Sequence, residues 1–370
     1  MKLLHFSDLH LDTPFAWAPP EVARDRRAAL RATLTRITDL AGQLGVDAIT
    51  CAGDLSEQER FTPDTAAFLR AAFAAVHPLP VLIAPGNHDW FGPWSLYAQV
   101  DWTDNVHVFT ADTLTPYELA DGLTVWGGAH RAPANTDGFL DAFTVERGGA
   151  HLGLFHGSAN GEVLFQGEGK VPHAPFRAEQ VRAAGLGHAL VGHYHRPSDA
   201  EDYTYPGNPD PLTFGEDGLR AAVEVHLGDD GQVTDRIRHQ VATSQAHDIT
   251  VDVTGAEHTT AIATKVAEAV AGLSGAVRIT VTGDIPPQVD LRPGDIAAAA
   301  RAVGIEAVLP RLGAIHVTYD LEALAAEATV RGQFVRDVQG APDLDDDTRR
   351  RVLITGLRAL DGRGDELEVC

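Results

Sequence analysis

The stretch KLLHFSDLH at residues 2–10 decides how the rest of the sequence is interpreted. Its first half, Lys2–Phe6, is mostly apolar and predicts a short buried strand, and the polar residues Asp8 and His10 follow directly after it. Because residues two positions apart in an extended segment share one face, these two side chains can reach the same ligand. The stretch therefore predicts a functional site at the end of a sheet.

Four later apolar runs end in the same way, with side chains that offer oxygen or nitrogen ligand atoms. The expected strands and the motifs after them are Ala48–Cys51 with Gly53-Asp54, Val81–Ala84 with Gly86-Asn87-His88-Asp89, His151–Phe155 with His156-Gly157, and His188–Gly192 with His193-Tyr194-His195. Each motif alone fits an ordinary turn or a packed histidine, but five of them after five strands favour a metal site. None of these motifs supplies a thiolate, which suits Mn²⁺, Fe or Zn²⁺ rather than a structural zinc.

Helical patterns separate the first three strands. Glu21–Leu44 predicts an Ala/Leu/Arg-rich helix, and Pro63–Val76 predicts a second helix that opens with proline. Alternating strands and helices predict a parallel sheet covered by helices. With further strands expected at Leu123–Gly127 and Ala221–Leu227, we expect a catalytic domain at residues 1–245.

The pattern changes near residue 245. We expect a smaller α+β capping domain at residues 246–320 and a helical C-terminal tail at 321–370. The elements expected in these two parts are strands at Ile249–Val253, Val277–Thr282 and Ile315–Tyr319, helices at Thr259–Leu273 and Asp295–Val303, and a mostly helical Leu321–Leu360 that an acidic turn at Asp343–Asp347 interrupts.

Composition narrows the class of protein. The chain has 370 residues, of which 44% are hydrophobic and 22% charged, and this excludes collagen-like and disordered chains. Two cysteines cannot build a disulfide framework. No apolar run reaches the roughly 18 residues of a membrane span. Asp8 and His10 interrupt the first apolar stretch too early for a signal peptide, so we expect a cytoplasmic protein that does not bind a membrane.

The series D-x-H, G-D, G-N-H-D, H-G and G-H-x-H resembles the calcineurin-like metallophosphoesterase superfamily. The match covers about residues 1–245, and the opening stretch Leu4–Asp12 is similar to that of the SbcD/YhaO-type DNA repair exonucleases. The loops Tyr205–Pro209 and Leu212–Glu216 also resemble that family, whereas resemblance beyond residue 245 is weaker. The resemblance implies a four-layer α-β-β-α sandwich and a metal-dependent hydrolase.

The resemblance also implies roles for particular residues. Two divalent ions, normally Mn²⁺ in this family, would share Asp54 as a bridging ligand. One ion would be held by Asp8, His10, Asp54 and His195, and the other by Asp54, Asn87, His156 and His193. His88 matches the catalytic histidine that contacts the scissile phosphate. The run Asp54-Leu55-Ser56-Glu57 departs from the family, which commonly has an aromatic residue and then His or Asp after Gly-Asp.

Three functions compete at this stage. The first is a nuclease in DNA repair and end processing, and the second is a phosphodiesterase or phosphatase that acts on small nucleotides. The third, a scaffold without activity, is disfavoured because buried ligand side chains are costly without metal. The net charge of −23 opposes duplex binding and favours single-stranded or frayed ends.

Further expectations concern substrate and partners. Arg24, Arg26, Arg27 and Arg31 form either a local basic face on the first helix or an ordinary solvated face. The family resemblance implies a coiled-coil ATPase subunit of the SbcC/YhaN kind and a homodimer. The other histidines are expected in packing, with His5 or His130 as candidates for supporting the metal ligands.

Overall fold

The computed structural model describes residues 1–134, 137–160, 172–305 and 307–362. The chain forms two compact units, Met1–Ala246 and His247–Cys370. The expected division of the chain into three parts, with a second boundary at residue 320, stays a prediction. No helix in the described ranges is long and apolar enough to cross a membrane.

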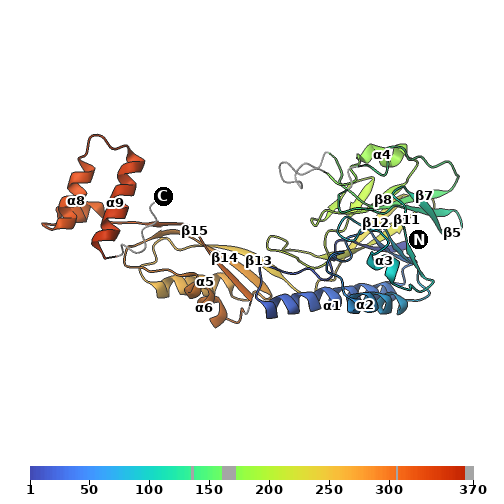
Figure 1. Ribbon diagram of the computed structural model, residues 1–370, viewed down its shortest axis with the longest axis horizontal. Coiled ribbons are helices and arrows are strands. Elements are labelled where there is room, and N and C mark those ends of the chain that lie inside the picture. Colours follow the sequence, from blue (N-terminus) through green and yellow to red (C-terminus); the bar gives the residue numbers. More distant parts are fainter. Residues whose placement is uncertain (135–136, 161–171, 306, 363–370) are drawn as a thin grey trace. The chain divides into compact units, whose positions relative to one another are not determined.

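The first unit contains two six-stranded sheets (Figure 1). In the first sheet, β1 to β4 are parallel, β11 is antiparallel to β1, and β12 is antiparallel to β11. Its strand order is β12 (Val233–Gln240), β11 (Ala221–Leu227), β1 (Lys2–Phe6), β2 (Ala48–Cys51), β3 (Val81–Ile83) and β4 (Val106–Val108). The parallel strands predicted in this part of the chain are confirmed.

The second sheet has a parallel centre and antiparallel edges. Its strand order is β5 (Thr115–Ala120), β6 (Leu123–Gly127), β7 (Ala150–His156), β8 (His188–Gly192), β10 (Tyr203–Tyr205) and β9 (Ser198–Asp199). In both sheets the register aligns the carboxyl ends of neighbouring strands, with Phe6 opposite Cys51 and His156 opposite Gly192. The loops that follow these strands therefore leave from the same edge.

Helices cover the outer faces of both sheets. The long helix α1 (Pro20–Leu44) and α2 (Pro63–Ala74) lie along the first sheet, and α4 (Ala178–Ala183) packs on the second. The helix α1 buries an apolar stripe that includes Leu30, Leu34 and Ile37, a spacing that keeps them on one face.

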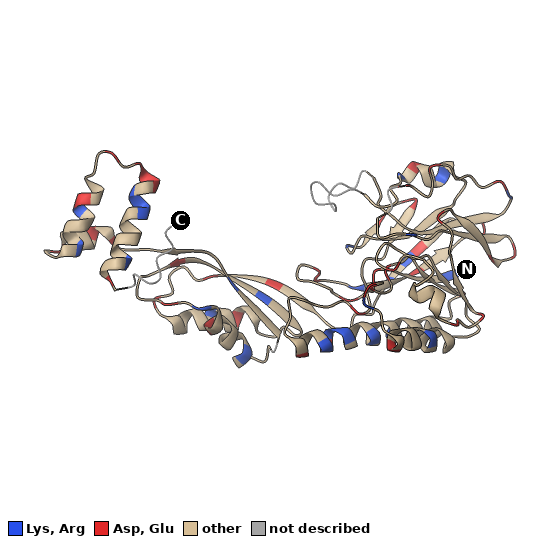
Figure 2. Ribbon diagram, in the orientation of Figure 1, with Lys and Arg blue, Asp and Glu red and all other residues tan. Residues whose placement is uncertain are grey.

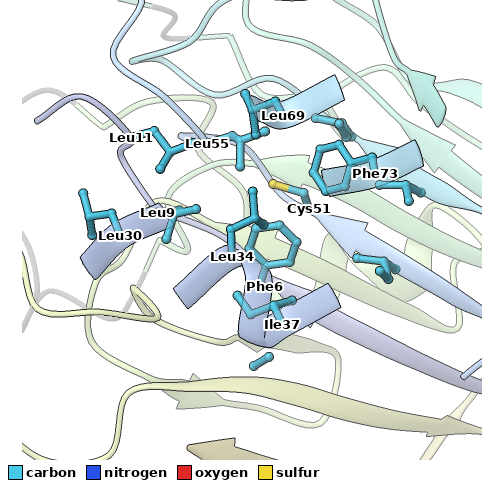
Figure 3. Packing of buried hydrophobic residues seen from close by; sticks show 14 of the residues in the cluster. Phe6, Leu9, Leu11, Leu30, Leu34, Ile37, Cys51, Leu55, Leu69 and Phe73 are labelled. Carbon is cyan, nitrogen blue, oxygen red and sulfur yellow. The ribbon is translucent and has the colours of Figure 1, made fainter. Parts of the chain in front are cut away.

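Three hydrophobic layers hold the first unit together. Figure 3 shows Leu34 of α1, Phe73 of α2 and Phe6 of β1 in the layer between the helices and the first sheet. A second layer fills the space between the two sheets, where Leu82 and Leu154 pack. The third lies between the second sheet and α4 and includes Phe155, Val181 and Val191. The predicted four-layer α-β-β-α sandwich is confirmed.

The second unit has one three-stranded sheet in the order β13 (Ala246–Asp252), β14 (Ala276–Ile285) and β15 (Ala307–Val317). Helices α5 (Thr259–Val270) and α6 (Pro293–Ala302) share a hydrophobic cluster with this sheet. Three further helices, α7 (Leu321–Ala326), α8 (Val330–Gln339) and α9 (Asp346–Leu360), form a separate cluster.

The bounds predicted for the last strand are wrong. We expected Ile315–Tyr319, but β15 begins at Ala307 and pairs in parallel with β14. The strand contains Pro310 and Gly313, residues that strand interiors seldom contain. Because β15 is an edge strand, a proline without an N–H group is tolerated there.

Candidate metal centre

The loops after β1 and β2 run side by side and bring two predicted ligands together. The N–H of Asp8 donates to the carbonyl of Gly53 at 3.0 Å, and the N–H of His10 donates to the carbonyl of Asp54 at 2.9 Å. One group of ligand atoms, from Asp8, His10 and His195, lies within 4.8 Å of one another. These are three of the four residues predicted for the first ion.

The fourth predicted residue, Asp54, lies between this group and a second one. Its Oδ2 atom is 3.6 Å from Nε2 of His10 and 3.2 Å from Nε2 of His156. The ligand atoms of Asp8, Asp54 and His156 also lie within 4.8 Å of one another. A carboxylate oxygen placed between histidines of two groups is suited to bridge two cations.

Asn87 and His193 complete the second group. Nε2 of His156 is 3.0 Å from Oδ1 of Asn87 and 3.3 Å from Nδ1 of His193. The N–H of His193 donates to Asp8 at 3.1 Å, which ties the loop after β8 to the loop after β1. The structure thus brings all seven predicted ligands together, and their role as ligands stays a prediction.

The donor set fits divalent cations. Nε2 of His10 is buried and has no hydrogen-bond partner among the described residues, although its Nδ1 bonds to Glu57 at 2.8 Å. A buried polar atom without a partner is costly, and a cation would satisfy it. Oxygen and imidazole donors without sulfur are typical of Mn²⁺, Fe or Zn²⁺ sites.

The charges of the site also favour a cation. Burial alone would raise the pKa of Asp54, but His156, His10 and His88 outweigh burial and hold it well below its usual value. Burial alone would lower the pKa of His156, whereas the neighbouring carboxylates of Asp54 and Asp8 raise it to about 9. Without metal, His156 therefore carries a proton in the place that a cation would take.

The backbone that presents the ligands is strained. Asp8, His10 and Asp54 have φ angles of 57°, 51° and 52°, in the left-handed region that side chains other than glycine seldom adopt. Glycine is needed close by, because a Cβ atom on Gly86 would come within 2.7 Å of the Asp54 nitrogen. Such strain is concentrated at functional sites.

Asp89 has a structural role and does not orient His88. Its buried carboxylate accepts hydrogen bonds from the N–H groups of Asp54 (3.0 Å), Leu55 (2.7 Å) and Gly86 (2.6 Å). It thereby joins the loop after β2 to the loop after β3. A different carboxylate contacts the ring of His88.

That carboxylate is Glu57, in the segment that departs from the family. The Nδ1 atoms of His10 and His88 contact its two oxygens at 2.8 Å and 3.0 Å. The hydrogen bond to Glu57 raises the pKa of His88 to about 9. The side chain of His88 is 47% exposed, so this ring is open to a substrate. Glu57 fixes the ring through Nδ1 and leaves Nε2 for that substrate.

Glu216 supports His195 in the same way. One of its oxygens accepts a hydrogen bond from Nδ1 of His195 at 2.8 Å, and the other accepts from Asn208 and the Leu212 N–H, each at 2.7 Å. The loop 212–216 therefore holds the ring so that Nε2 points to the site. Carboxylates behind metal-binding histidines commonly have this function.

Of three further histidines, two lie beside the site and one does not. His130 is fully buried and its Nε2 donates to the carbonyl of His156 at 2.7 Å. The ring of His173 lies 5.4 Å from that of His193, and no sequence signal indicated this residue. His5 bonds to Thr50 in the core of the sheets rather than to a ligand.

The expected basic face on α1 is only partly present. Figure 2 shows basic residues along this helix, but Arg26 is buried, with its guanidinium 3.5 Å from Asp210 and in contact with the carbonyl of Pro211. Arg31 pairs with Asp64 at 2.5 Å. The prediction that Arg26 faces solvent is wrong, because its carboxylate partner comes from a loop far along the chain.

Comparison with known proteins identifies a matching family and a similar protein. A profile of the calcineurin-like phosphoesterase family matches residues 1–197. The chain is 25% identical over 283 residues to the metallophosphoesterase YhaO of Bacillus subtilis strain 168, in a match that covers 71% of this chain and 65% of YhaO. The chain thus spans less than two thirds of that relative.

Two solved structures are similar to part of the chain. TT1561 of Thermus thermophilus is 15% identical, with a TM-score of 0.38, over 64% of this chain and 98% of that protein. Yfce, a phosphoesterase from E. coli, is 12% identical, with a TM-score of 0.30, over 64% of this chain and 99% of that protein.

Proposed function

The chain belongs to the calcineurin-like phosphoesterase family, and from that premise we propose that it is a two-metal-ion nuclease acting on DNA. The observation that carries this proposal is the position of Asp54 between two groups of ligand atoms, with the exposed His88 beside them. A site open to solvent at His88 suits a polymeric substrate, of which only one phosphate needs to enter.

The chemistry follows from the side chains. Asp8, His10, Asp54 and His195 would hold one cation, and Asp54, Asn87, His156 and His193 the other. Bound divalent cations supply charge stabilisation for phosphate oxygens and lower the pKa of a water. His88 contributes a hydrogen bond or a proton to the leaving oxygen from Nε2, while Glu57 holds the ring at Nδ1. Glu216 keeps His195 directed at the site.

We assign Mn²⁺ as the native metal, with Fe and Zn²⁺ as alternatives. The ligand set contains carboxylates, one amide and imidazoles, a mixture that serves all three metals. Elemental analysis of protein purified without chelator should give about two equivalents of one of them. Protein with less than one equivalent of any divalent metal, after dialysis against Mn²⁺, would contradict the assignment.

We further propose single-stranded or frayed DNA as the substrate. A net charge of −23 gains little from the counterions that a long duplex releases. A single strand also bends freely, whereas distorting a duplex has an energetic cost. Residues 246–320 are assigned to holding the strand and 321–370 to a coiled-coil ATPase partner. We also propose that the protein forms a homodimer and is located in the cytoplasm.

The alternative function is hydrolysis of small nucleotides. It is favoured by a pocket of about 280 Å³ beside His88, which is close to the lower limit of small-molecule sites, about 300 Å³. The same metals and the same histidine would serve this reaction. The two candidates therefore differ in substrate and not in chemistry.

One experiment separates the candidates. Metal-loaded protein is incubated with matched single- and double-stranded oligonucleotides, a cyclic nucleotide and a phosphomonoester, at low and moderate salt. Faster cleavage of the single strand supports the nuclease, and equal rates on both strands remove the strand preference. Rapid hydrolysis of only the small substrates favours the alternative. The variant Asp54→Asn controls for contaminating nucleases, which it would leave active.

A further inference from the structure

A pocket next to the metal centre has no role in the mechanism above. It has a volume of about 280 Å³, and its lining includes Asn87 and His88 of the site together with Arg60, Trp90 and Pro133. Trp90 is half-buried, while Arg60 and Pro133 are exposed. The pocket therefore opens directly beside the phosphate position that His88 is expected to contact.

The walls of this pocket are fixed to the site. The N–H of Gln58 donates to the carbonyl of His88 at 2.8 Å, which joins the loop that carries Arg60 to the loop that carries Trp90. Next to Trp90, the N–H of Phe91 donates to the carbonyl of His130 at 2.8 Å. Because these bonds anchor both loops, a ligand in the pocket would have a defined position relative to the metals.

The pocket is lined by aromatic, apolar and charged side chains. An indole ring and a proline provide flat apolar surfaces, and the exposed Arg60 supplies a positive charge. Two carboxylates also line the pocket: Glu57, which already binds His10 and His88 through its two oxygens, and the exposed Glu59. The pocket thus offers a stacking surface and a cation close to a phosphate site, a combination that binds nucleotides.

We propose that this pocket binds the nucleobase of the nucleotide on the His88 side of the scissile phosphate. Trp90 stacks on the base, and Arg60 contacts the sugar–phosphate backbone of the same nucleotide. The inference rests on the proposed function and names a substrate-binding residue for it. A volume of about 280 Å³ is sufficient for one nucleobase.

The test measures binding of two probes by the full chain, dAMP and the base-free 2-deoxyribose 5-phosphate, with and without Mn²⁺. We expect wild-type protein to bind dAMP about 5- to 140-fold more tightly, the range for stacking of one base. Trp90→Ala should remove this preference and Trp90→Phe should keep most of it. Arg60→Ala should weaken both probes by a similar factor.

The matched control is Trp94→Ala. Trp94 is 82% exposed on the same loop but does not line the pocket, so its removal should leave the preference intact. Equal binding of the two probes by wild type would overturn the inference, as would a preference that survives in Trp90→Ala. If Trp90→Ala does not fold, as judged by circular dichroism, the wild-type comparison and Arg60→Ala decide the question.

Different results would contradict the nuclease proposal and the base-pocket proposal. If the protein prefers dAMP but cleaves no oligonucleotide, the nuclease proposal fails and the base pocket stands. If it cleaves an oligonucleotide equally well with a base or an abasic residue on the His88 side, the pocket fails and the nuclease stands.

Discussion

The two units of this chain bury different kinds of side chain. The first unit buries carboxylates, imidazoles and arginines, among them Asp8, Asp54 and His156. Within residues 247–305 and 307–362, the described part of the second unit, buried side chains such as Val266 and Val281 are all apolar. Both units have a hydrophobic core, so stability alone does not explain the difference.

The difference locates the chemistry independently of any motif. Burying a polar group costs free energy unless it is hydrogen-bonded or coordinated, so a cluster of buried carboxylates and histidines that could hold a metal indicates a functional site. In the first unit they gather at the ends of β1, β2, β3, β7 and β8. The second unit has strands and helices of the same kinds but no such gathering among its described residues.

Removing the carboxylate of Asp54, which both predicted metal sites share, should have the largest effect on the buried polar site of the first unit. Asp54→Ala should lose both metals, and turnover should fall by at least about 10⁴-fold, because each ion supplies several kcal/mol of charge stabilisation. Elemental analysis and initial rates on one oligonucleotide check this. If the variant kept two equivalents of metal, Asp54 would not be the bridging ligand.

Removing the exposed histidine should separate catalysis from metal binding. His88→Ala should keep both metals but lose about 10²–10⁴-fold in rate, the usual effect of removing a positioned acid. Its side chain hydrogen-bonds to Glu57 and only packs edge-on against the ring of His10, so coordination should not change. A variant with an empty metal site would show that His88 is itself a ligand.

A smaller effect is expected from the support of His195. Both side-chain oxygens of Glu216 accept hydrogen bonds. In Glu216→Gln an NH₂ group replaces one of these oxygens and cannot accept, so the His195 ring should turn. Metal affinity should fall about 10- to 100-fold, as for other residues behind metal ligands. Calorimetric titration with Mn²⁺ measures this, with the exposed Glu146→Gln as control. If Glu216→Gln and Glu146→Gln bound Mn²⁺ with equal affinity, Glu216 would have no role in positioning the ring of His195.

The smallest effect should come from the second unit. Arg278 pairs with Asp248 at the surface, and such pairs contribute about 0–1 kcal/mol. Arg278→Ala should therefore change the free energy of unfolding by no more than about 1 kcal/mol and leave the metal content unchanged. Urea unfolding and elemental analysis test both parts. Loss of metal would show that the units are coupled.

The sequence predicts the buried strands well and the edge strands poorly. Lys2–Phe6, Ala48–Cys51 and His188–Gly192 have the predicted bounds because each is a short apolar run buried on both faces. The edge strand Val233–Gln240 was not predicted, since none of it is fully buried and its polar residues do not alternate. Periodicity reports burial, so strands with little burial give a weak signal.

The residues of the candidate site could also be predicted only in part from the sequence. Ligands that directly follow strands, such as Asp54 and His193, are visible because the parallel register fixes where strand ends lie. The functions of Glu57 and Glu216 are not visible, because each depends on a histidine 47 or 21 residues away in sequence. His173 follows no predicted strand, so no local pattern marks it.

The left-handed backbone of Asp8, His10 and Asp54 has a consequence for laboratory evolution. Glycine adopts such φ angles freely, whereas other residues pay a conformational cost. A library screened only for thermal stability in the absence of metal would therefore be enriched in glycine at these positions. Its most heat-resistant members would be the ones that have lost their ligands. Selection for turnover, rather than for folding, must keep aspartate and histidine there.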